Sequence, residues 1–152
     1  MSRYSEKRAE VTLRGELILI DHSCLLPNGM WGACPPHVVL SAHITDEELG
    51  GRLVAVLQAT RYLKEFDRSI PDYETAVPGL LGCKNYREFL KGALFCGVSL
   101  EGNALRFYPS VNQGPRMGFV FKPLSETVTL PFPSDFEPIG RTLREVLASR
   151  CE

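Results

Sequence analysis

Hydrophobic residues recur along this chain with two different spacings. In residues 45–60 and 134–150 they fall at positions i, i+4, i+7 and i+8, which lines one face of an α-helix. The stripe residues are Leu49, Leu53, Val56 and Leu57 in the first stretch and Ile139, Leu143, Val146 and Leu147 in the second. Residues 10–20, 93–100, 104–111, 118–122 and 126–132 alternate or are apolar throughout, as strands are. The pattern predicts an α+β fold, an antiparallel-rich sheet with helices packed on it. Parallel βαβ winding is the weaker alternative, because most strand spacings suit hairpins.

Polar residues mark where several elements begin and turn. Thr45 to Glu48 and Ser134 to Glu137 both match the capping box, in which a hydroxyl and a carboxylate satisfy the first amides of a helix. Asn85 is expected to cap a third, short helix that ends near Gly92. Residues 101–103, Glu-Gly-Asn, predict a hairpin turn between two strands.

The two helical stretches belong to longer segments that resemble each other. Residues 38–60 align without a gap on residues 128–150, at an offset of ninety. Identical residues stand at 38/128, 40/130, 47/137, 50/140, 53/143, 56/146 and 57/147. We therefore predict one domain, 1–152, with an internal duplication of a strand–loop–helix unit and pseudo-repeats at about 10–60 and 93–150; chance likeness between amphipathic helices is the alternative. Gly50 and Gly140 stand in the first helical turns, where a side chain is expected to crowd the sheet.

Composition places the chain among ordinary globular proteins. Of its 152 residues, 44% are hydrophobic and 23% charged, and the longest apolar runs are too short to span a bilayer. The first residues carry charge and no apolar signal segment follows them, so a cytoplasmic protein without membrane contact is expected. Five scattered cysteines without a C-x-x-C pair predict free thiols in a reducing compartment. The net charge of −1 offers no general basic field for direct contact with nucleic acid.

Residues 22–37 concentrate four possible metal ligands, His22, Cys24, Cys34 and His37, the number that a structural zinc ion takes. The usual C-x2–4-C hook is missing, and the prolines at 35 and 36 stiffen the segment without aiming the side chains at one point. Pro27, Asn28 and Gly29 are typical of a turn. We therefore expect a loop with no metal and no cofactor, and zinc is the alternative.

No catalytic motif is recognisable in the sequence. Residues 97–102, Gly-Val-Ser-Leu-Glu-Gly, are one residue too long for a nucleophile elbow, and no phosphate-binding glycine loop is present. The acidic residues 46–48 are explained as helix capping. His43 beside them is the best of the weak candidates for a catalytic residue. A histidine without catalytic function at the end of a strand is the favoured interpretation. The protein is expected not to be an enzyme.

Negative charge is concentrated in residues 65–74, which we call the acidic connection. Four carboxylates against Arg68 give this segment a charge of −3, although the whole chain carries only −1. It lies within residues 61–84, which contain two prolines and two glycines and are expected to form a surface connection. The segment is either a solvated loop or a recognition surface for a basic partner. The residues predicted to bind are Glu65, Asp67, Asp72, Tyr73 and Glu74.

Residues 80–150 resemble the immunity proteins of bacterial contact-dependent growth inhibition (CDI) systems, in the group formerly known only as a domain of unknown function. The matching features are "YREF" followed by "KGA", a proline ending the next strand, a "GF" strand, and "PFPSDFEPIGRTLREVLASR". These motifs concern packing and carry no chemistry. The first half of the chain joins the resemblance only through the repeat.

The resemblance implies a small cytosolic protein that forms a 1:1 complex with the toxic C-terminal domain of its cognate surface-displayed effector. Such toxins are often nucleases, and the immunity protein blocks their active or substrate-binding surface without any catalytic residue of its own. Interfaces diverge between members, so no binding residue is carried over. A regulatory domain that binds a small molecule without catalysis is the alternative function.

Overall fold

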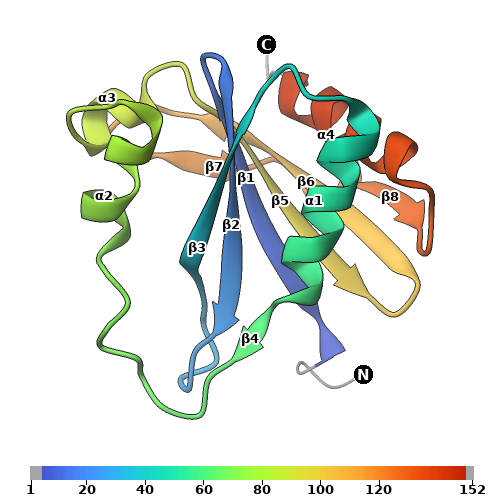
Figure 1. The fold of residues 1–152 in the computed structure, drawn as a ribbon, viewed down its shortest axis with the longest axis horizontal. Coiled ribbons are helices and arrows are strands. Elements are labelled where there is room, and N and C mark those ends of the chain that lie inside the picture. Colours follow the sequence, from blue (N-terminus) through green and yellow to red (C-terminus); the bar gives the residue numbers. More distant parts are fainter. Residues whose placement is uncertain (1–4, 150–152) are drawn as a thin grey trace.

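The computed structural model describes residues 5–149, which form one layered α+β arrangement (Figure 1). The strands are β1 Lys7–Arg14, β2 Leu17–Leu25, β3 Trp31–Ser41, β4 Arg61–Tyr62, β5 Leu94–Glu101, β6 Ala104–Asn112, β7 Phe119–Phe121 and β8 Val128–Pro131. The helices are α1 Asp46–Gln58, α2 Tyr73–Ala76, α3 Tyr86–Leu90 and α4 Phe136–Ala148, with 3-10 turns at Pro78–Leu81 and Leu124–Glu126. No helix among these residues is long and apolar enough to cross a membrane.

The strands form a sheet in the order β3-β2-β1-β5-β6-β7, with β4 added to β2 and β8 added to β6. Every pairing within residues 5–149 is antiparallel except the short one between β2 and β4. The predicted α+β class is therefore confirmed. The hairpin at residues 101–103 is confirmed too, since Glu101 of β5 stands opposite Ala104 of β6.

The segment 10–20, predicted as one strand, is instead the junction of two. β1 and β2 form a hairpin in which Arg14 pairs with Leu17, and Gly15 takes a φ of +59° in the turn between them. Glycine reaches this left-handed conformation without the steric cost that other residues meet. The error arose because alternation in β1 and the continuous apolar run in β2 merged into one hydrophobic segment.

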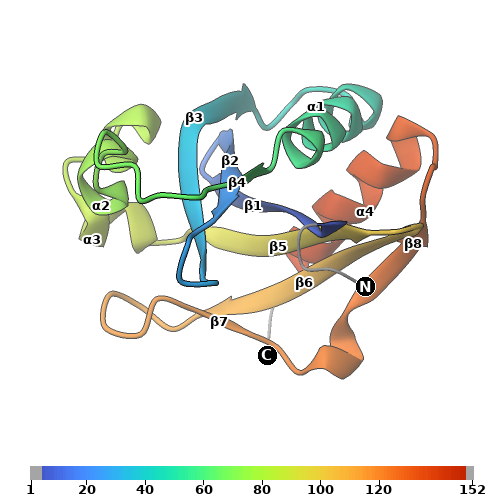
Figure 2. The same ribbon diagram turned by 90° about the horizontal axis from the view of Figure 1, so that it is seen from below.

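Helices α1 and α4 lie side by side on one face of the sheet, as Figures 1 and 2 show. All eight predicted stripe residues are buried, and they share one core with residues of β1, β2, β5 and β6. The stripes thus face the same sheet, as predicted, and residues 38–41 and 128–131 both lie in strands that precede these helices. Duplication as the origin of this likeness stays a hypothesis.

Capping follows the sequence prediction at two of the three helices. The Thr45 hydroxyl accepts from the Glu48 amide at 3.1 Å, and the Asn85 side chain accepts from the Glu88 amide at 2.9 Å. The predicted second capping box is wrong. Asp135 is the cap residue of α4, and Ser134 Oγ turns back to donate to the Pro131 carbonyl oxygen at 2.5 Å.

Gly50 and Gly140 mark the contact between the two long helices. A Cβ atom on Gly50 would lie 2.0 Å from the Phe136 carbonyl oxygen, and one on Gly140 would lie 1.9 Å from the Asp46 carbonyl oxygen. Each glycine therefore faces the backbone of the opposite helix, at the residue four positions before the glycine of that helix. The crowding predicted for these positions exists, but the neighbour is the partner helix and not the sheet.

The opposite face of the sheet is covered by short pieces. Residues 73–90 fold α2, a 3-10 turn and α3 over the β2 side, so the segment expected to be a plain connection supplies a second, smaller core. Its buried members are Leu19, Val77, Leu81, Cys83, Phe89 and Leu90. β7 folds back over this face, and Figure 2 shows α1 and β7 on opposite sides of β1 and β5.

Candidate functional site

The acidic connection runs along the outer edge of the molecule from β4 to α2 (Figure 1). The side chains of Glu65, Asp67, Asp72 and Glu74 are all exposed. No lysine, arginine or histidine within residues 5–149 forms an ion pair with any of the four. The structure therefore leaves the charge of these carboxylates open to a partner.

Two of these carboxylates also shape the connection. Asp67 Oδ1 accepts from the Ser69 amide at 3.0 Å and from the Ser69 hydroxyl at 2.5 Å, and these hydrogen bonds lower the pKa of Asp67. Asp72 Oδ2 accepts from the Thr75 hydroxyl at 3.1 Å. An ionised carboxylate has about four acceptor sites, so both retain capacity for a partner.

Tyr73 is placed differently from its predicted role as an exposed anchor. Its hydroxyl donates to Asp21 Oδ2 at 2.8 Å, and its ring makes edge contacts with His37 and Phe89. Burial, followed by the charge of Asp21, raises the pKa of Tyr73. Tyr73 thus ties the end of the acidic connection to the sheet. The exposed aromatic ring of the connection is Phe66, at 61%.

Asp21 receives Tyr73 because β2 and β3 form an irregular pair at this point. Asp21 stands opposite His37, His22 stands opposite Cys34, and the two extra residues of β3 form a bulge. The Asp21 carboxylate is fully buried and uses both oxygens, since His37 Nδ1 lies 2.5 Å from Oδ1. A buried carboxylate is stable only with such partners, so this network fixes the position of the acidic connection.

The cysteines of the 22–37 segment correct the prediction of free thiols. Cys24 of β2 and Cys34 of β3 form a disulfide, with 6.2 Å between their Cα atoms. They became neighbours because the segment is not a loop but a hairpin, in which Cys34 lies diagonally across from Cys24. Cys83 and Cys96 are free and buried. Cys151 lies outside the described residues.

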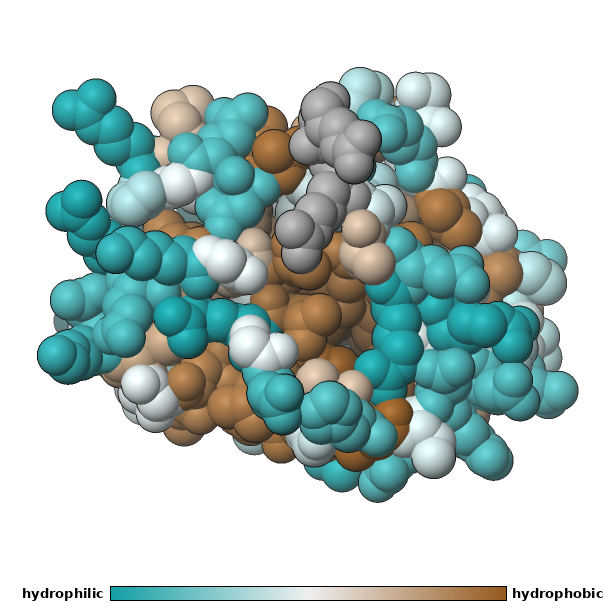
Figure 3. Space-filling view, turned by 90° about the horizontal axis from the view of Figure 1, so that it is seen from above, coloured by the Kyte–Doolittle hydropathy of each residue, from teal (hydrophilic) through white to brown (hydrophobic). Residues whose placement is uncertain are grey.

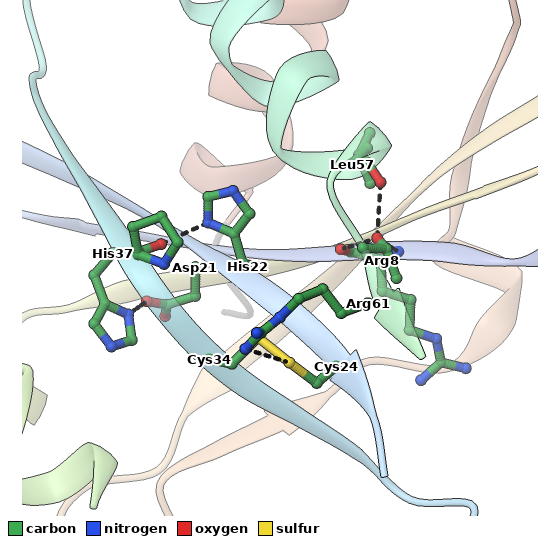
Figure 4. The surroundings of a disulfide bond; sticks show 10 residues. Arg8, Asp21, His22, Cys24, Cys34, His37, Leu57 and Arg61 are labelled. Carbon is green, nitrogen blue, oxygen red and sulfur yellow. Dashed lines mark hydrogen bonds and ion pairs between the residues drawn. A yellow bond between two sulfur atoms is a disulfide. The ribbon is translucent and has the colours of Figure 1, made fainter. Parts of the chain in front are cut away.

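The two histidines of the segment serve other partners. His22 Nδ1 lies 2.5 Å from the Pro36 carbonyl oxygen, and His37 contacts Asp21. Figure 4 shows each imidazole directed at its own oxygen and away from the disulfide. The four possible ligands therefore do not converge, and no group of three or more metal-ligating side chains is found within residues 5–149.

His43 and the acidic residues at the start of α1, considered above as a catalytic site, also contact other partners and not each other. His43 Nε2 lies 2.9 Å from Glu16 Oε2 at the surface. Asp46 Oδ1 accepts from Arg144 Nε at 2.7 Å, and Arg144 also donates to the Ala42 and Ile44 carbonyl oxygens. Asp46 thus joins α1 to α4, and it does not form a pair with His43.

A feature that the sequence did not reveal is a cleft on the sheet face opposite α1 and α4. Two hollows of about 460 and 470 Å³ adjoin there, with Glu10 of β1 and Phe121 of β7 lining both. We call them together the Glu10 cleft. Its walls are largely aromatic, with Tyr73, Tyr86 and Phe95 on one side and Trp31 and Tyr108 on the other. A further hollow of about 410 Å³, lined by residues 90–95, 110–112, 114 and 115 together with Leu147 and Ser149, has a hydrophobic floor (Figure 3).

Glu10 is held in an unfavourable setting for a charge. Burial, and next the carboxylate of Asp21, raises the pKa of Glu10 from 4.5 to about 7, while Arg8 acts in the opposite direction. Because this pKa is raised in the folded state, the contribution of Glu10 to stability is complete below pH 4.5 and is lost as the pH rises through about 7. At neutral pH the cleft therefore contains a carboxyl group that a nearby cation would stabilise in its charged form.

Comparison with known proteins identifies the family. The sequence profile of the CDI immunity protein, CdiI, matches residues 7–151. The chain belongs to the CDI immunity protein family. The match includes the first half of the chain, which the sequence resemblance had reached only through the repeat. No curated protein matches the sequence.

Two solved structures show the fold of this CDI immunity protein. One is a protein of unknown function from Neisseria meningitidis, NMB0488, with a TM-score of 0.76, 19% identity, and coverage of 100% of this chain and 99% of that one. The other comes from the CdiA-CT/CdiI toxin and immunity complex of Yersinia pseudotuberculosis, with a TM-score of 0.73, 18% identity, and coverage of 97% and 98%. At such identities the likeness concerns the fold.

Proposed function

We propose that this CDI immunity protein binds the C-terminal toxin domain of its cognate effector in a 1:1 complex and neutralises it in the cytoplasm without catalysis. The family match over residues 7–151 carries the proposal. The Yersinia pseudotuberculosis neighbour, which belongs to a toxin and immunity complex, supports it. The cytoplasmic location rests on the family match and not on the cysteines, because disulfides such as Cys24–Cys34 are rare in reducing compartments.

The charge of the acidic connection supports a nuclease as the class of toxin. A nuclease must be basic where it holds phosphates, and clustered carboxylates attract and cover such a surface. Glu65, Asp67, Asp72 and Glu74 are exposed on a segment that can vary without disturbing the main core. We assign the contact with the basic surface of the toxin to these four residues, and to Tyr73 the role of holding them in place.

Co-expression with the cognate toxin domain tests the proposed function. Cells that make both proteins are expected to grow, whereas cells that make the toxin domain alone die. The purified pair is expected to elute as a 1:1 complex in size-exclusion chromatography with light scattering. Death of the cells in the presence of properly folded immunity protein would refute the proposal.

Charge reversal tests the assigned surface. In the variant Asp72→Lys/Glu74→Lys the association rate at low salt is expected to fall by about tenfold or more, because long-range attraction is lost. The free energy of unfolding should change by no more than about 1 kcal/mol, since both side chains are exposed and Asp72 gives up only its hydrogen bond with Thr75. Stopped-flow association at several salt concentrations measures the effect.

The matched control is Glu137→Lys/Glu145→Lys, which makes the same change in net charge at two exposed positions of α4, away from the connection. If both double variants slow association equally, the effect comes from net charge alone and the assignment of the acidic connection is wrong. In that case the acidic residues 46–48 are the next surface to test.

A further inference from the structure

The Glu10 cleft contains a single charged side chain without a partner. Three charged side chains line it, and two of them are engaged: Arg8 pairs with Glu6 at 3.2 Å and lies over the Trp31 ring, and Lys122 Nζ donates to the Ser149 carbonyl oxygen at 2.7 Å. The Glu10 carboxylate forms no hydrogen bond or ion pair within residues 5–149, and Arg8, whose charge lowers the pKa of Glu10, pairs with Glu6 instead. We propose that the cleft receives a lysine or arginine side chain of the toxin domain, which pairs with the Glu10 carboxylate.

The groups around Glu10 cannot take this role themselves. Asp21 on β2 has the same charge as Glu10 and is engaged by His37 and Tyr73. The hydroxyl of Tyr73 is therefore already used in its hydrogen bond to Asp21. The negative charge of Glu10 raises the pKa of Tyr73 and of Tyr86 on α3. A carboxylate that is mostly buried and unpaired is costly, and an incoming cation with good geometry removes that cost.

The walls of the cleft suit a long basic side chain. Aromatic faces attract a lysine or arginine cation, and its hydrocarbon stem packs against apolar surface. The rim is apolar as well, since Met117, Phe121 and Leu124 are 65%, 56% and 79% exposed. Half of the strongly exposed large hydrophobic side chains of residues 5–149 lie between residues 117 and 128. Such a concentration marks a surface that a partner covers.

The position of the cleft favours a protein partner over a free small cation. Tyr73 belongs to the acidic connection and also lines the cleft, so the two features adjoin. A basic toxin surface that lies on the exposed carboxylates is thereby placed to insert one of its side chains at Glu10. This inference rests on the proposed function and adds to it a buried, central anchor of the kind that dominates binding energy.

The variant Glu10→Gln tests the anchor, because it keeps the shape of the side chain and removes only its charge. The dissociation constant of the complex with the toxin domain is expected to rise by about 10- to 100-fold at pH 8, mainly through faster dissociation. Wild-type affinity should decline between pH 8 and pH 6 as Glu10 takes up its proton, and Glu10→Gln should lack this part of the pH dependence. Glu145→Gln, which neutralises an exposed carboxylate of α4 outside the cleft, should bind like the wild type.

A second measurement needs no toxin. N-acetyl-arginine amide is titrated into the wild-type protein and Glu10→Gln, and the backbone amide of Gly97, which lines the cleft, is followed by NMR. Saturable binding with a dissociation constant on the order of millimolar, absent from Glu10→Gln, is the expected result.

The two measurements distinguish failure of the Glu10 anchor from failure of the proposed function. If the wild-type protein forms a toxin complex and Glu10→Gln binds as tightly, the anchor is wrong and the proposed function stands; Glu10-dependent binding of the arginine derivative would then assign the cleft to a small cation. If no toxin complex forms at all, the proposed function fails. In that case absence of probe binding also overturns the cation site, whereas Glu10-dependent probe binding supports it.

Discussion

Replacing Gly50 or Gly140 with alanine is expected to lower the free energy of unfolding by more than about 3 kcal/mol, at or above the upper end of the usual cost of overpacking. The added methyl group would lie about 2 Å from a backbone carbonyl oxygen of the opposite helix. A backbone atom cannot rotate away, so α1 and α4 must move apart and open the core beneath them. Urea denaturation measures the loss.

Gly51→Ala is the matched control, because it lies next to Gly50 in the same helix. Its Cβ atom would meet the edge of the Phe136 ring at 3.2 Å, and a side chain can yield where a backbone cannot. Alanine also favours helix over glycine by about 1 kcal/mol, so Gly51→Ala should leave stability within about 1 kcal/mol of the wild type. Equal losses at positions 50 and 51 would contradict the close approach of the helices.

The double variant Gly50→Ala/Gly140→Ala sharpens the test. The two methyl groups force the same separation of the same two helices, so the second should add little to the first. A double loss equal to the sum of the single losses would mean that each glycine acts through a separate contact.

Leu53→Ala and Leu143→Ala are each expected to cost about 2 to 5 kcal/mol, since each removes three carbon atoms from a packed interior and leaves a cavity. Both leucines are fully buried, and both belong to the core beneath the helix pair. Leu124→Ala, at a position 79% exposed, is the control and should change stability by about 0.5 kcal/mol or less. A loss below about 1 kcal/mol at either leucine would show that its helix is peripheral.

The sequence predicted best the features that depend on neighbouring residues. The stripe of Leu49, Leu53 and Leu57 follows from helical periodicity, and the cap at Asn85 depends on a residue three positions later. The turn at Gly15 could have been predicted, since glycine favours the left-handed conformation found there. The apolar residues on both sides made the two strands look like one hydrophobic segment.

Contacts between distant residues were not predictable in the same way. Alternation along β1 puts Glu10 on the face opposite Val11, but only the return of β7 across that face turns it into a cleft. The hydrogen bond from Tyr73 to Asp21 joins residues 52 positions apart, so nothing local marks Tyr73 as buried. The disulfide required the register of a hairpin, and the turn at Pro27 to Gly29, midway between Cys24 and Cys34, was the signal that could have suggested it.

The mutual dependence of α1 and α4 also sets the order of events during synthesis. Ribosomes add about 5 to 20 residues per second, so α1 emerges roughly 5 to 20 seconds before the helix that completes its packing. Throughout that interval the nascent chain holds β1, β2 and α1 with an apolar face still uncovered. The glycine contact can therefore form only after residue 140 has left the ribosome, and until then the apolar stripe of α1 lacks its partner helix.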